Sequence, residues 1–308
     1  MKLLSIVIPV YNSEENIDDL VLKINEAMQN IDFELILVND CSKDKSWLKI
    51  TENLNKHAHI IGINLRKNSG QDNAIICGLN YATGDYITIM DDDLQHSPFD
   101  ILSLLEKCKE GFDVCYANFN TKHQAAWKNF GSWLNGKVAE LLIDKPKGLY
   151  LSPFFVFEKG ILPEIVSYKG PFPYIQGLIF SCTKNITQIP IAHHKRNKGE
   201  SNFNLIRSIV VFSKLLTGYS VLPLRIATYT GLFFAVFSFF MAIYYVYLYY
   251  YGSEIVAGWS TLVVLLLLIG GLILMSLGLI GEYIGRIYLS LNTKPQYVIK
   301  EVKKKDIK

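Results

Sequence analysis

Charged residues are scarce in this chain and are missing altogether from two long stretches. Asp, Glu, Lys and Arg make up 19% of its 308 residues, against about 25% in an average soluble domain. None occurs between Ile226 and Ser253 or between Ile255 and Gly281. Because a helix of about 20 apolar residues crosses the hydrocarbon core of a bilayer, we predict two spans, at about 226–251 and 257–281. Two buried helices of a soluble core are the alternative, although such helices are rarely apolar on every face.

The motifs of several protein classes are also absent. No G-x-G-x-x-G follows the first apolar run and no G-x-x-x-x-G-K-[ST] occurs, which argues against a dinucleotide oxidoreductase and a P-loop nucleotide hydrolase. No G-x-S-x-G elbow of a hydrolase is present. The five cysteines form no C-x-x-C pair, a pattern typical of reduced core thiols rather than a disulfide frame or a zinc site. The net charge of +3 is too small to indicate a nucleic-acid partner.

What the first part of the chain does contain is an alternation of strand-like and helix-like segments. Short runs rich in β-branched residues lie at Leu4–Val10, Phe33–Val38, Ile60–Leu65 and Tyr86–Met90. The segments between them have helical apolar spacing, with Ser42 and Ser69 (or Asn68) as expected N-caps. This alternation predicts a parallel sheet covered by helices on both faces. Ligands of such sheets bind beyond the carboxyl ends of the strands, so the candidate site lies at Pro9–Glu14, Asn39–Asp44 and Asp91–Gln95.

Three consecutive carboxylates, Asp91, Asp92 and Asp93, follow the last of these runs. Like charges this close repel one another, so a compensating positive charge is expected. A hard divalent cation, held by one or two carboxylates and by substrate phosphates, would supply it. Side chains alternate along a strand, so Asp91 and Asp93 are expected to point one way and Asp92 the other. A solvated acidic turn is the alternative.

The other two strand ends indicate a nucleotide. Asp40 can accept a hydrogen bond from a base N–H or a ribose hydroxyl, or it can cap a helix. The segment Pro9–Glu14 can wrap a base by stacking and backbone contacts, and alone it is only a turn. Together the three strand ends describe a pocket for a nucleoside diphosphate.

These segments resemble signatures of the family 2 inverting glycosyltransferases of GT-A fold. Their sequences cover Ile6–Asn12, Val38–Asp44, Met90–Gln95 and the helix start Asn68–Gln71 with Gly78-Leu79. Residues His193–Phe203 resemble a segment of the polyprenyl-phosphate branch, and Gly281–Arg286 with Lys294–Tyr297 is similar to its two-span members. The Q-x-x-R-W hallmark of processive synthases is absent, which disfavours a cellulose-type reaction.

The resemblance implies roles for individual residues. The nucleotide would be held by Pro9, Tyr11, Glu14, Asp40 and Asp92, and Mg²⁺ or Mn²⁺ by Asp91, Asp93 and Gln95. Lys195, Arg196 and Ser201 would close over and bind the phosphates of the donor or the acceptor. Asp93, Lys195 and Arg196 are the candidate catalytic residues, since metal and basic groups stabilise a departing diphosphate.

One departure from the family pattern concerns the general base. The branch often has D-F-R-L or S-F-R-L before a helix, and here Ser152 stands at the position of the Asp and Phe154 at that of the Arg. The base is therefore unassigned, with His193, His194 and Glu158 as candidates. A phosphate monoester is anionic at neutral pH and attacks without a base, whereas a hydroxyl acceptor needs one. The missing Asp favours a phosphate acceptor, and the missing Arg removes one phosphate contact.

The remaining sequence predicts how the chain meets the membrane. Residues 203–220 have separate polar and apolar sides, as expected of an interfacial helix lying on the bilayer, with a soluble surface helix as the alternative. Basic residues flank both spans while the connector around Glu254 has none, so the catalytic domain and both termini are expected in the cytoplasm. Gly281 and Gly285 permit close helix packing, including packing between subunits.

We therefore expect an α/β, Rossmann-like GT-A domain at residues 1–202, an interfacial helix at 203–220, a hairpin within 221–290 and a basic cytoplasmic tail at 291–308. The expected activity moves a sugar from a nucleotide sugar, such as a UDP-sugar, to a polyprenyl phosphate such as undecaprenyl phosphate. It would act in the inner (cytoplasmic) membrane, in cell-surface glycan assembly. Two alternatives stay open: transfer to a saccharide or lipid-linked oligosaccharide hydroxyl, and a catalytically silent membrane scaffold, which the Asp91/Asp93 pair disfavours.

Overall fold

The computed structural model describes residues 3–119, 145–170, 173–191, 222–251, 258–292 and 294–305. The chain forms two compact units, one of Met1–Phe203 with Thr293–Lys308 and one of Asn204–Asn292. The residues that follow the hairpin thus belong to the same unit as the N-terminal domain.

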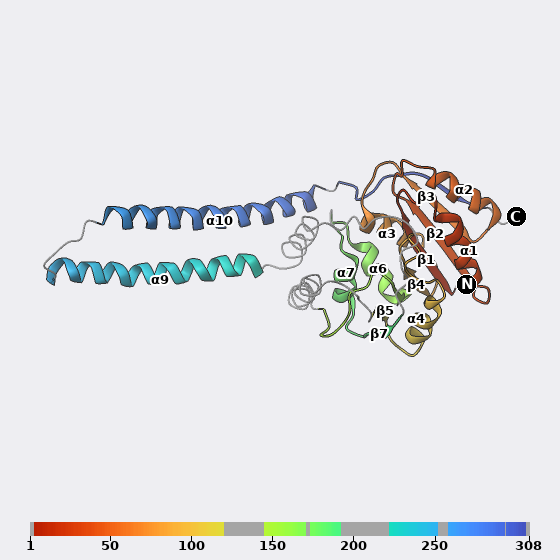
Figure 1. The fold of residues 1–308 in the computed structure, drawn as a ribbon, viewed down its shortest axis with the longest axis horizontal. Helices are drawn as coiled ribbons and strands as arrows, with labels where there is room; N and C mark the ends of the chain where they lie inside the picture. The colour runs from red at the N-terminus through yellow and green to blue at the C-terminus, as the bar shows by residue number, and fades with distance from the viewer. Residues whose placement is uncertain are drawn as a thin grey trace. The chain divides into compact units, whose positions relative to one another are not determined.

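The first unit is built on one mixed sheet, with helices between the strands (Figure 1). Its strands are β1 (Leu4–Val10), β2 (Phe33–Asn39), β3 (Ile60–Leu65), β4 (Tyr86–Ile89), β5 (Val114–Asn118), β6 (Phe155–Glu158), β7 (Ile186–Pro190) and β8 (Ile299–Lys304). The helices are α1 (Ile17–Ala27), α2 (Ser46–Lys56), α3 (Gln71–Leu79), α4 (Asp100–Lys109), α6 (Leu162–Ser167) and α7 (Ile175–Cys182), with a short 3₁₀ turn at Lys159–Ile161.

The strand order is β7-β5-β6-β4-β1-β2-β3-β8. Strands β4, β1, β2 and β3 are parallel neighbours, which confirms the predicted strand–helix alternation. β6 and β8 run antiparallel to their partners. Because β4, β1 and β2 are adjacent and parallel, their carboxyl ends meet at one edge of the sheet.

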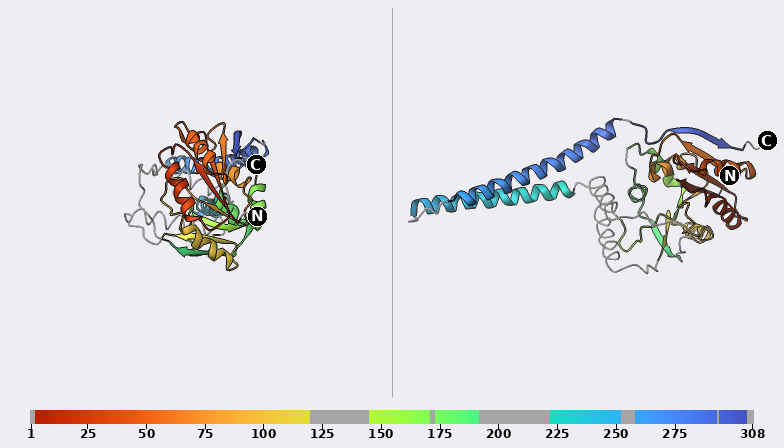
Figure 2. Two further views of the ribbon diagram at one scale, coloured as in Figure 1. Left: turned by 90° about the vertical axis from the view of Figure 1, so that its right-hand side faces the viewer. Right: turned by 45° about the horizontal axis from the view of Figure 1, so that its top comes forward.

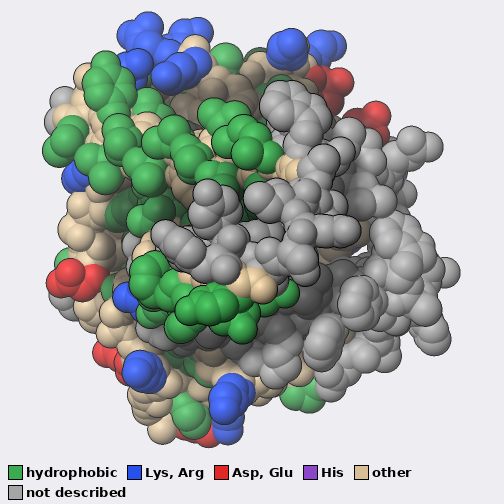
Figure 3. Space-filling view, turned by 90° about the vertical axis from the view of Figure 1, so that its left-hand side faces the viewer, with side chains coloured by type: hydrophobic (Ala, Val, Ile, Leu, Met, Phe, Trp, Pro, Cys, Tyr) green, Lys and Arg blue, Asp and Glu red, His purple; other side chains and the backbone are tan. Residues whose placement is uncertain are grey.

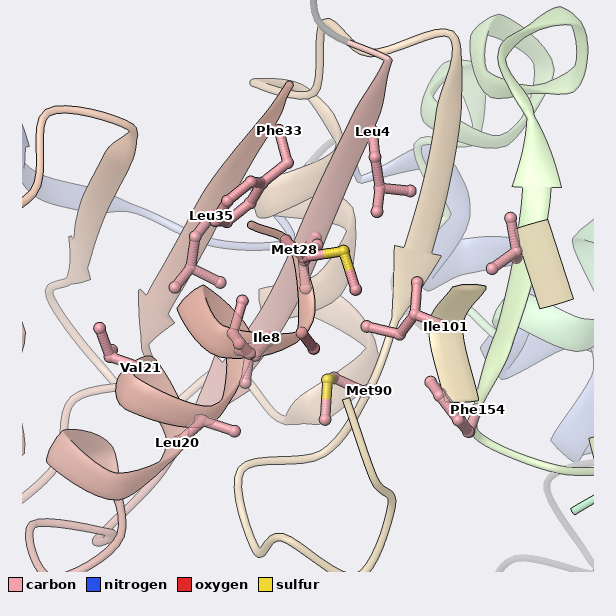
Figure 4. Packing of buried hydrophobic residues seen from close by; sticks show 14 of the residues in the cluster. Leu4, Ile8, Leu20, Val21, Met28, Phe33, Leu35, Met90, Ile101 and Phe154 are labelled. Atoms are coloured by element: carbon pink, nitrogen blue, oxygen red, sulfur yellow. The ribbon is translucent and has the colours of Figure 1, made fainter. Parts of the chain in front are cut away.

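The sheet buries apolar side chains on both faces. On one face α1 packs against β1 and β2, and Figure 4 shows Leu20 and Val21 of α1 pointing into the same core as Ile8 and Leu35. On the other face α3 lies close to the strands at Gly78, where a Cβ atom would lie 2.5 Å from Val7 Cγ1. Only glycine permits this approach, so the glycine of the G-L motif is explained by packing.

The starts of two helices differ from the predictions. Helix α2 begins at Ser46, and its first amide donates to Asp44 Oδ1 at 3.0 Å, so Ser42 is not its cap. Helix α3 begins at Gln71 after Gly70, whose φ is +89°. Neither Asn68 nor Ser69 is the N-cap, because a residue with positive φ makes the turn into this helix and glycine adopts it without strain.

The C-terminal segment also differs from the expected tail. Residues Ile299–Lys304 form β8, an edge strand antiparallel to β3. Its side chains alternate between partly buried and exposed positions. The lysines that suggested a solvated tail are typical of an edge strand, where they discourage pairing with other chains.

The second unit is a helical hairpin of α9 (Leu222–Tyr251) and α10 (Trp259–Leu291), which lie side by side (Figure 2). Both helices are long and apolar enough to cross a membrane by length and composition, with candidate spans Leu224–Met241 and Leu268–Leu291. Figure 3, which views the hairpin end-on, shows hydrophobic side chains gathered over these helices. The second helix continues past the predicted end of its span at residue 281.

Candidate active site at the carboxyl ends of β1, β2 and β4

Each of the three strand ends is followed by a residue in the left-handed conformation. Within the described ranges, the non-glycine residues with positive φ are Asn12 (52°), Cys41 (58°) and Leu94 (58°). They follow β1, β2 and β4, respectively. Such residues cost conformational free energy and cluster at functional sites, where the surrounding structure holds them. The backbone therefore marks the same edge that the sequence motifs mark.

The acidic loop after β4 is held by hydrogen bonds to two different elements. Asp91 Oδ1 accepts from Gln71 Nε2 at 2.7 Å, at the start of α3. Asp92 Oδ2 accepts from the Tyr11 amide at 3.2 Å and from Ser13 Oγ at 2.5 Å, in the loop after β1. Asp91 and Asp92 thus bond to different elements. Because β4 ends at Ile89, the three carboxylates lie beyond the strand, and the predicted shared direction of Asp91 and Asp93 stays a prediction.

Asp93 makes a local hydrogen bond within the acidic loop. Its Oδ1 accepts from the backbone amide of Gln95 at 3.1 Å. Burial raises the pKa of Asp92, the hydrogen bonds from Ser13 and Tyr11 oppose that rise, and the neighbouring Asp93 adds to it. The loop therefore carries concentrated negative charge that favours a cationic ligand.

The oxygen donors of Asp91 and Asp93 fit a hard divalent cation. In the part of the chain that the structure describes, no group of three or more His, Cys, Asp and Glu side chains is arranged as a metal site. Mg²⁺ commonly binds through one or two carboxylates and completes its shell with substrate phosphates and water. The donor set here fits that kind of shared site rather than a closed one made by protein alone.

Asp40 anchors the loop that leads into α3. It is 3% exposed, and its two carboxylate oxygens accept from the Ser69 amide at 2.7 Å and the Gly70 amide at 2.9 Å. Burial raises the pKa of this carboxyl, and the two amides partly offset the rise. The contacts match the helix-anchoring alternative, while each oxygen keeps a second lone pair for a ligand.

The loops after β1 and β2 interlock. Glu14 Oε2 accepts from the Lys45 amide at 2.8 Å, and the Glu14 amide donates to Asp44 Oδ2 at 3.0 Å. Asn12 Oδ1 accepts from the Lys43 amide at 2.9 Å. The carboxylate of Glu14, expected to hold the nucleoside, thus positions the neighbouring loop.

Two other residues expected at the nucleotide lie in the β1 segment. Pro9 is buried within β1, where it pairs with Val38. The Tyr11 side chain is 46% exposed at the carboxyl end of that strand. Of the two, Tyr11 presents a ring on which a base can stack.

The departure at Ser152 and Phe154 is a core feature. Both side chains are 0% exposed, and Ser152 Oγ accepts from the Phe154 amide at 3.1 Å. The Phe154 ring stacks on His96, with centroids 5.1 Å apart, and His96 also stacks on Phe119 at 5.2 Å. Ser152 is therefore not a surface base.

Glu158 lies at the wrong end of the sheet to serve as the base. It pairs with Tyr86 at the start of β4, whereas the acidic loop follows the other end of that strand. Its position excludes it from the carboxylate cluster.

His96 was not expected from the sequence to take part in the site, and it fixes the acidic loop to the core by stacking. Its signal was a histidine directly after the acidic motif, D-D-D-L-Q-H. Five other candidate residues lie outside the described residues: His193, His194, Lys195, Arg196 and Ser201. The expected interfacial helix at 203–220 lies outside them as well.

A mixed α/β sheet with a parallel centre, whose strand ends gather oxygen donors, is a Rossmann-like GT-A fold. The chain belongs to glycosyl transferase family 2, whose model matches residues 5–164, and it is a glycosyltransferase. A second model, the GtrB C-terminal hairpin, matches residues 222–287. Catalytic domain and hairpin are thus both recognised, in the predicted order.

Two curated relatives match nearly the whole chain. An uncharacterized glycosyltransferase, YkcC, from Bacillus subtilis (strain 168) is 31% identical over 300 residues, covering 96% of this chain and 93% of the relative. The undecaprenyl-phosphate 4-deoxy-4-formamido-L-arabinose transferase of Enterobacter sp. (strain 638) is 30% identical over 303 residues, covering 97% and 93%.

Solved structures support the fold. Glucosyl-3-phosphoglycerate synthase from Mycobacterium tuberculosis, in complex with Mn²⁺, UDP and phosphoglyceric acid, superposes with a TM-score of 0.54 at 17% identity. The match covers 70% of this chain and 76% of that one. At this identity the likeness shows a shared fold.

Proposed function

We propose that this glycosyltransferase transfers a sugar from a UDP-sugar to a polyprenyl phosphate, such as undecaprenyl phosphate, with inversion at the anomeric carbon. The observation that carries the proposal is the joining of a family 2 domain to an apolar hairpin. The same arrangement extends over nearly the whole length of a relative named as an undecaprenyl-phosphate transferase. A long polyprenyl chain lies in the bilayer, so an enzyme using it gains from membrane helices.

The proposed donor site is the edge formed by the ends of β1, β2 and β4. Tyr11 and Asp40 would contact the nucleoside, and Asp91, Asp93 and Gln95 would hold Mg²⁺ or Mn²⁺. When bound, such a cation neutralises negative charge on a departing diphosphate. UDP and Mn²⁺ in the synthase complex of similar fold support this choice of donor and cation.

The proposed acceptor is a phosphate because the protein offers no base at the expected position. Ser152 is buried and bonded to the Phe154 amide, and Glu158 lies beside Tyr86 at the far end of β4. A phosphate monoester, with a second pKa near 6, is largely dianionic at neutral pH and needs no proton acceptor. Lys195, Arg196 and Ser201 are proposed to contact its oxygens.

The path of the chain supports the proposed membrane topology. The chain leaves the first unit before α9 and returns to it after α10, where β8 pairs with β3. A hairpin whose two ends join one sheet has both ends on the same side of the membrane. With the positive-inside rule, we propose a cytoplasmic catalytic unit in the inner membrane and association through Gly281 and Gly285.

A transfer assay tests the function. Purified full-length protein receives undecaprenyl phosphate, Mg²⁺ or Mn²⁺, and radiolabelled sugar nucleotides, and the products are partitioned between butanol and water. Label in the butanol phase, lost on mild acid treatment, is the expected result. Label on an added saccharide in the water phase would show that the acceptor is a saccharide and not a polyprenyl phosphate. No transfer from any donor would favour the catalytically silent scaffold.

A further inference from the structure

A row of polar side chains crosses three neighbouring strands of the sheet near its functional edge. Asn39 of β2, Asn64 of β3 and Glu301 of β8 are register partners in neighbouring strands. Asn39 Nδ2 donates to Asn64 Oδ1 at 2.8 Å, and Asn64 Nδ2 donates to Glu301 Oε1 at 3.3 Å. We call Asn39, Asn64 and Glu301 the polar ladder.

The polar ladder continues into the loops of the candidate site. Ser42 Oγ donates to Asn39 Oδ1 at 2.5 Å and accepts from the Asn12 amide at 3.0 Å. Asn12 has a φ of 52° and follows Tyr11 directly. An unbroken series of hydrogen bonds therefore joins the C-terminal strand to the segment proposed to meet the nucleoside.

The direction of the bonds in this series is set from both ends, by Glu301 and by the backbone. The amides of Asn12 and Ser42 can only donate, to Ser42 Oγ at 3.0 Å and to Asn39 Oδ1 at 3.4 Å. An ionised carboxylate only accepts hydrogen bonds, whereas an asparagine amide can be flipped to donate or accept at either end. Because Glu301 accepts, Asn64 donates to it and accepts from Asn39. Asn39 then donates to Asn64 and accepts from Ser42, whose oxygen is left to accept from Asn12.

Burial makes this direction costly to lose. Asn39 and Asn64 are 2% and 5% exposed, so water does not readily replace a missing partner. A buried polar group without a partner is strongly unfavourable, and a chain of hydrogen bonds in a low dielectric is mutually reinforcing. Without the acceptor at Glu301, the Asn64 amide group can reorient, and only Ser42 then holds Asn39, through its amide and its hydroxyl.

We propose that Glu301 is a positioning residue for the donor nucleotide, acting through the polar ladder and Ser42 on the backbone at Tyr11 and Asn12. This inference rests on the proposed use of a nucleotide sugar at that edge. It gives the segment beyond the membrane hairpin a part in donor binding, although Glu301 itself lies on an edge strand.

The test measures the dissociation constant of UDP with Mn²⁺ by calorimetry, on full-length protein in detergent and well below its melting temperature. Glu301→Ala is expected to weaken UDP binding by about tenfold, the effect of one unsatisfied buried hydrogen bond. Glu301→Gln keeps an acceptor oxygen and is expected to stay within about threefold of wild type. Val302→Ala is the matched control, since Val302 is on the same strand with its side chain 41% exposed.

A double-mutant cycle separates positioning from general destabilisation. Once Asn64→Ala has broken the polar ladder, adding Glu301→Ala is expected to leave the UDP affinity unchanged, because coupled residues are not additive. If Glu301→Ala does not fold, Ser42→Ala breaks the series at its other end and is expected to weaken UDP to the same extent.

Three results would overturn the proposal: an unchanged UDP affinity in Glu301→Ala with only a lower melting temperature, an equal loss in Val302→Ala, or full additivity in the cycle. A wild-type protein that binds UDP but transfers no sugar would contradict the proposed function and leave the polar ladder standing. A wild-type protein that binds no nucleotide would overturn both.

Discussion

The side-chain amide of Gln71 donates a 2.7 Å hydrogen bond to Oδ1 of Asp91, linking the first residue of α3 to the first carboxylate after β4. The contact joins two motifs that stand apart in the sequence. A carboxylate whose oxygen is held in this way is oriented before a cation or substrate arrives.

Replacing Gln71 by Ala is therefore expected to raise the Mn²⁺ concentration needed for half-maximal transfer by about tenfold, the lower end of what is lost when a group that orients a metal ligand is removed. The measurement is a Mn²⁺ titration at saturating donor. Asn80→Ala, at the other end of α3, is the control and should leave the titration unchanged. An identical Mn²⁺ dependence in Gln71→Ala would show that the contact does not orient Asp91.

Substitutions in the acidic loop, Asp91–Asp93, should have two kinds of effect on transfer. Asp91→Asn and Asp93→Asn are expected to abolish transfer and leave the melting temperature near that of wild type, since each removes a proposed charged ligand of the cation. Asp92→Asn keeps one acceptor oxygen for Tyr11 and Ser13, so its smaller defect should appear in nucleotide affinity. Transfer at the full rate in EDTA would remove the cation from the mechanism.

Ser152→Ala tests the absence of a protein base. The hydroxyl accepts from the Phe154 amide in the core, so its loss should lower the free energy of unfolding by about 1–3 kcal/mol. Transfer to a lipid phosphate should fall by less than about tenfold, under 1.4 kcal/mol of barrier. Its rate should rise through about pH 6 and then stay level. A single His or Glu variant that stops transfer but binds nucleotide would favour a hydroxyl acceptor.

Protonation of Glu301 should lower the thermal stability of the folded protein. The hydrogen bond from Asn64 lowers its pKa, with a further lowering from Lys303. The folded protein therefore releases this proton more readily than the unfolded chain. Its contribution is present above the unfolded pKa of about 4.3 and is lost as the pH falls through the folded-state value. The thermal stabilities of wild type and Glu301→Gln should thus converge as the pH falls below the folded-state pKa; a pH-independent difference would contradict this.

The effect of removing the hairpin on folding and UDP binding should depend on whether β8 is kept. Truncation before Arg225 also deletes β8 and bares the edge of β3, so we expect an aggregation-prone domain that binds nucleotide poorly. Replacing residues 204–292 by a flexible Gly/Ser linker keeps β8 and should give a soluble domain that binds UDP. Gel filtration and calorimetry compare the two proteins, and equal behaviour would show that β8 is dispensable.

The sequence predicted the parallel part of the sheet because its strands are continuous apolar runs separated by periodic helices. Leu4–Val10 and Ile60–Leu65 have the predicted bounds. It failed at β8, because an edge strand with one solvated face and several lysines has the composition of a tail. Only the pairing with β3, more than 230 positions away, makes this segment a strand.

The sequence predicted which strand ends lie together, but it predicted the contacts of their side chains less well. Strand ends can be recognised from the sequence, whereas the partners of their side chains depend on loops that come together only in the fold. Asp40 and Glu14 were expected at a ligand, and their described contacts are with neighbouring loops. Asn39 was noted only as part of a strand-end motif and Asn64 not at all, since an isolated asparagine in an apolar strand reveals nothing about its neighbour.

The pairing of β3 with β8 also sets an order of events during biosynthesis. At about 5–20 residues per second, β8 leaves the ribosome on the order of ten seconds or more after β3, and both helices of the hairpin are translated in between. The backbone edge of β3 therefore stays unpaired while the hairpin is made. The sheet is therefore completed late in maturation. Until then, we expect chaperones to shield the unpaired edge of β3 in the nascent chain.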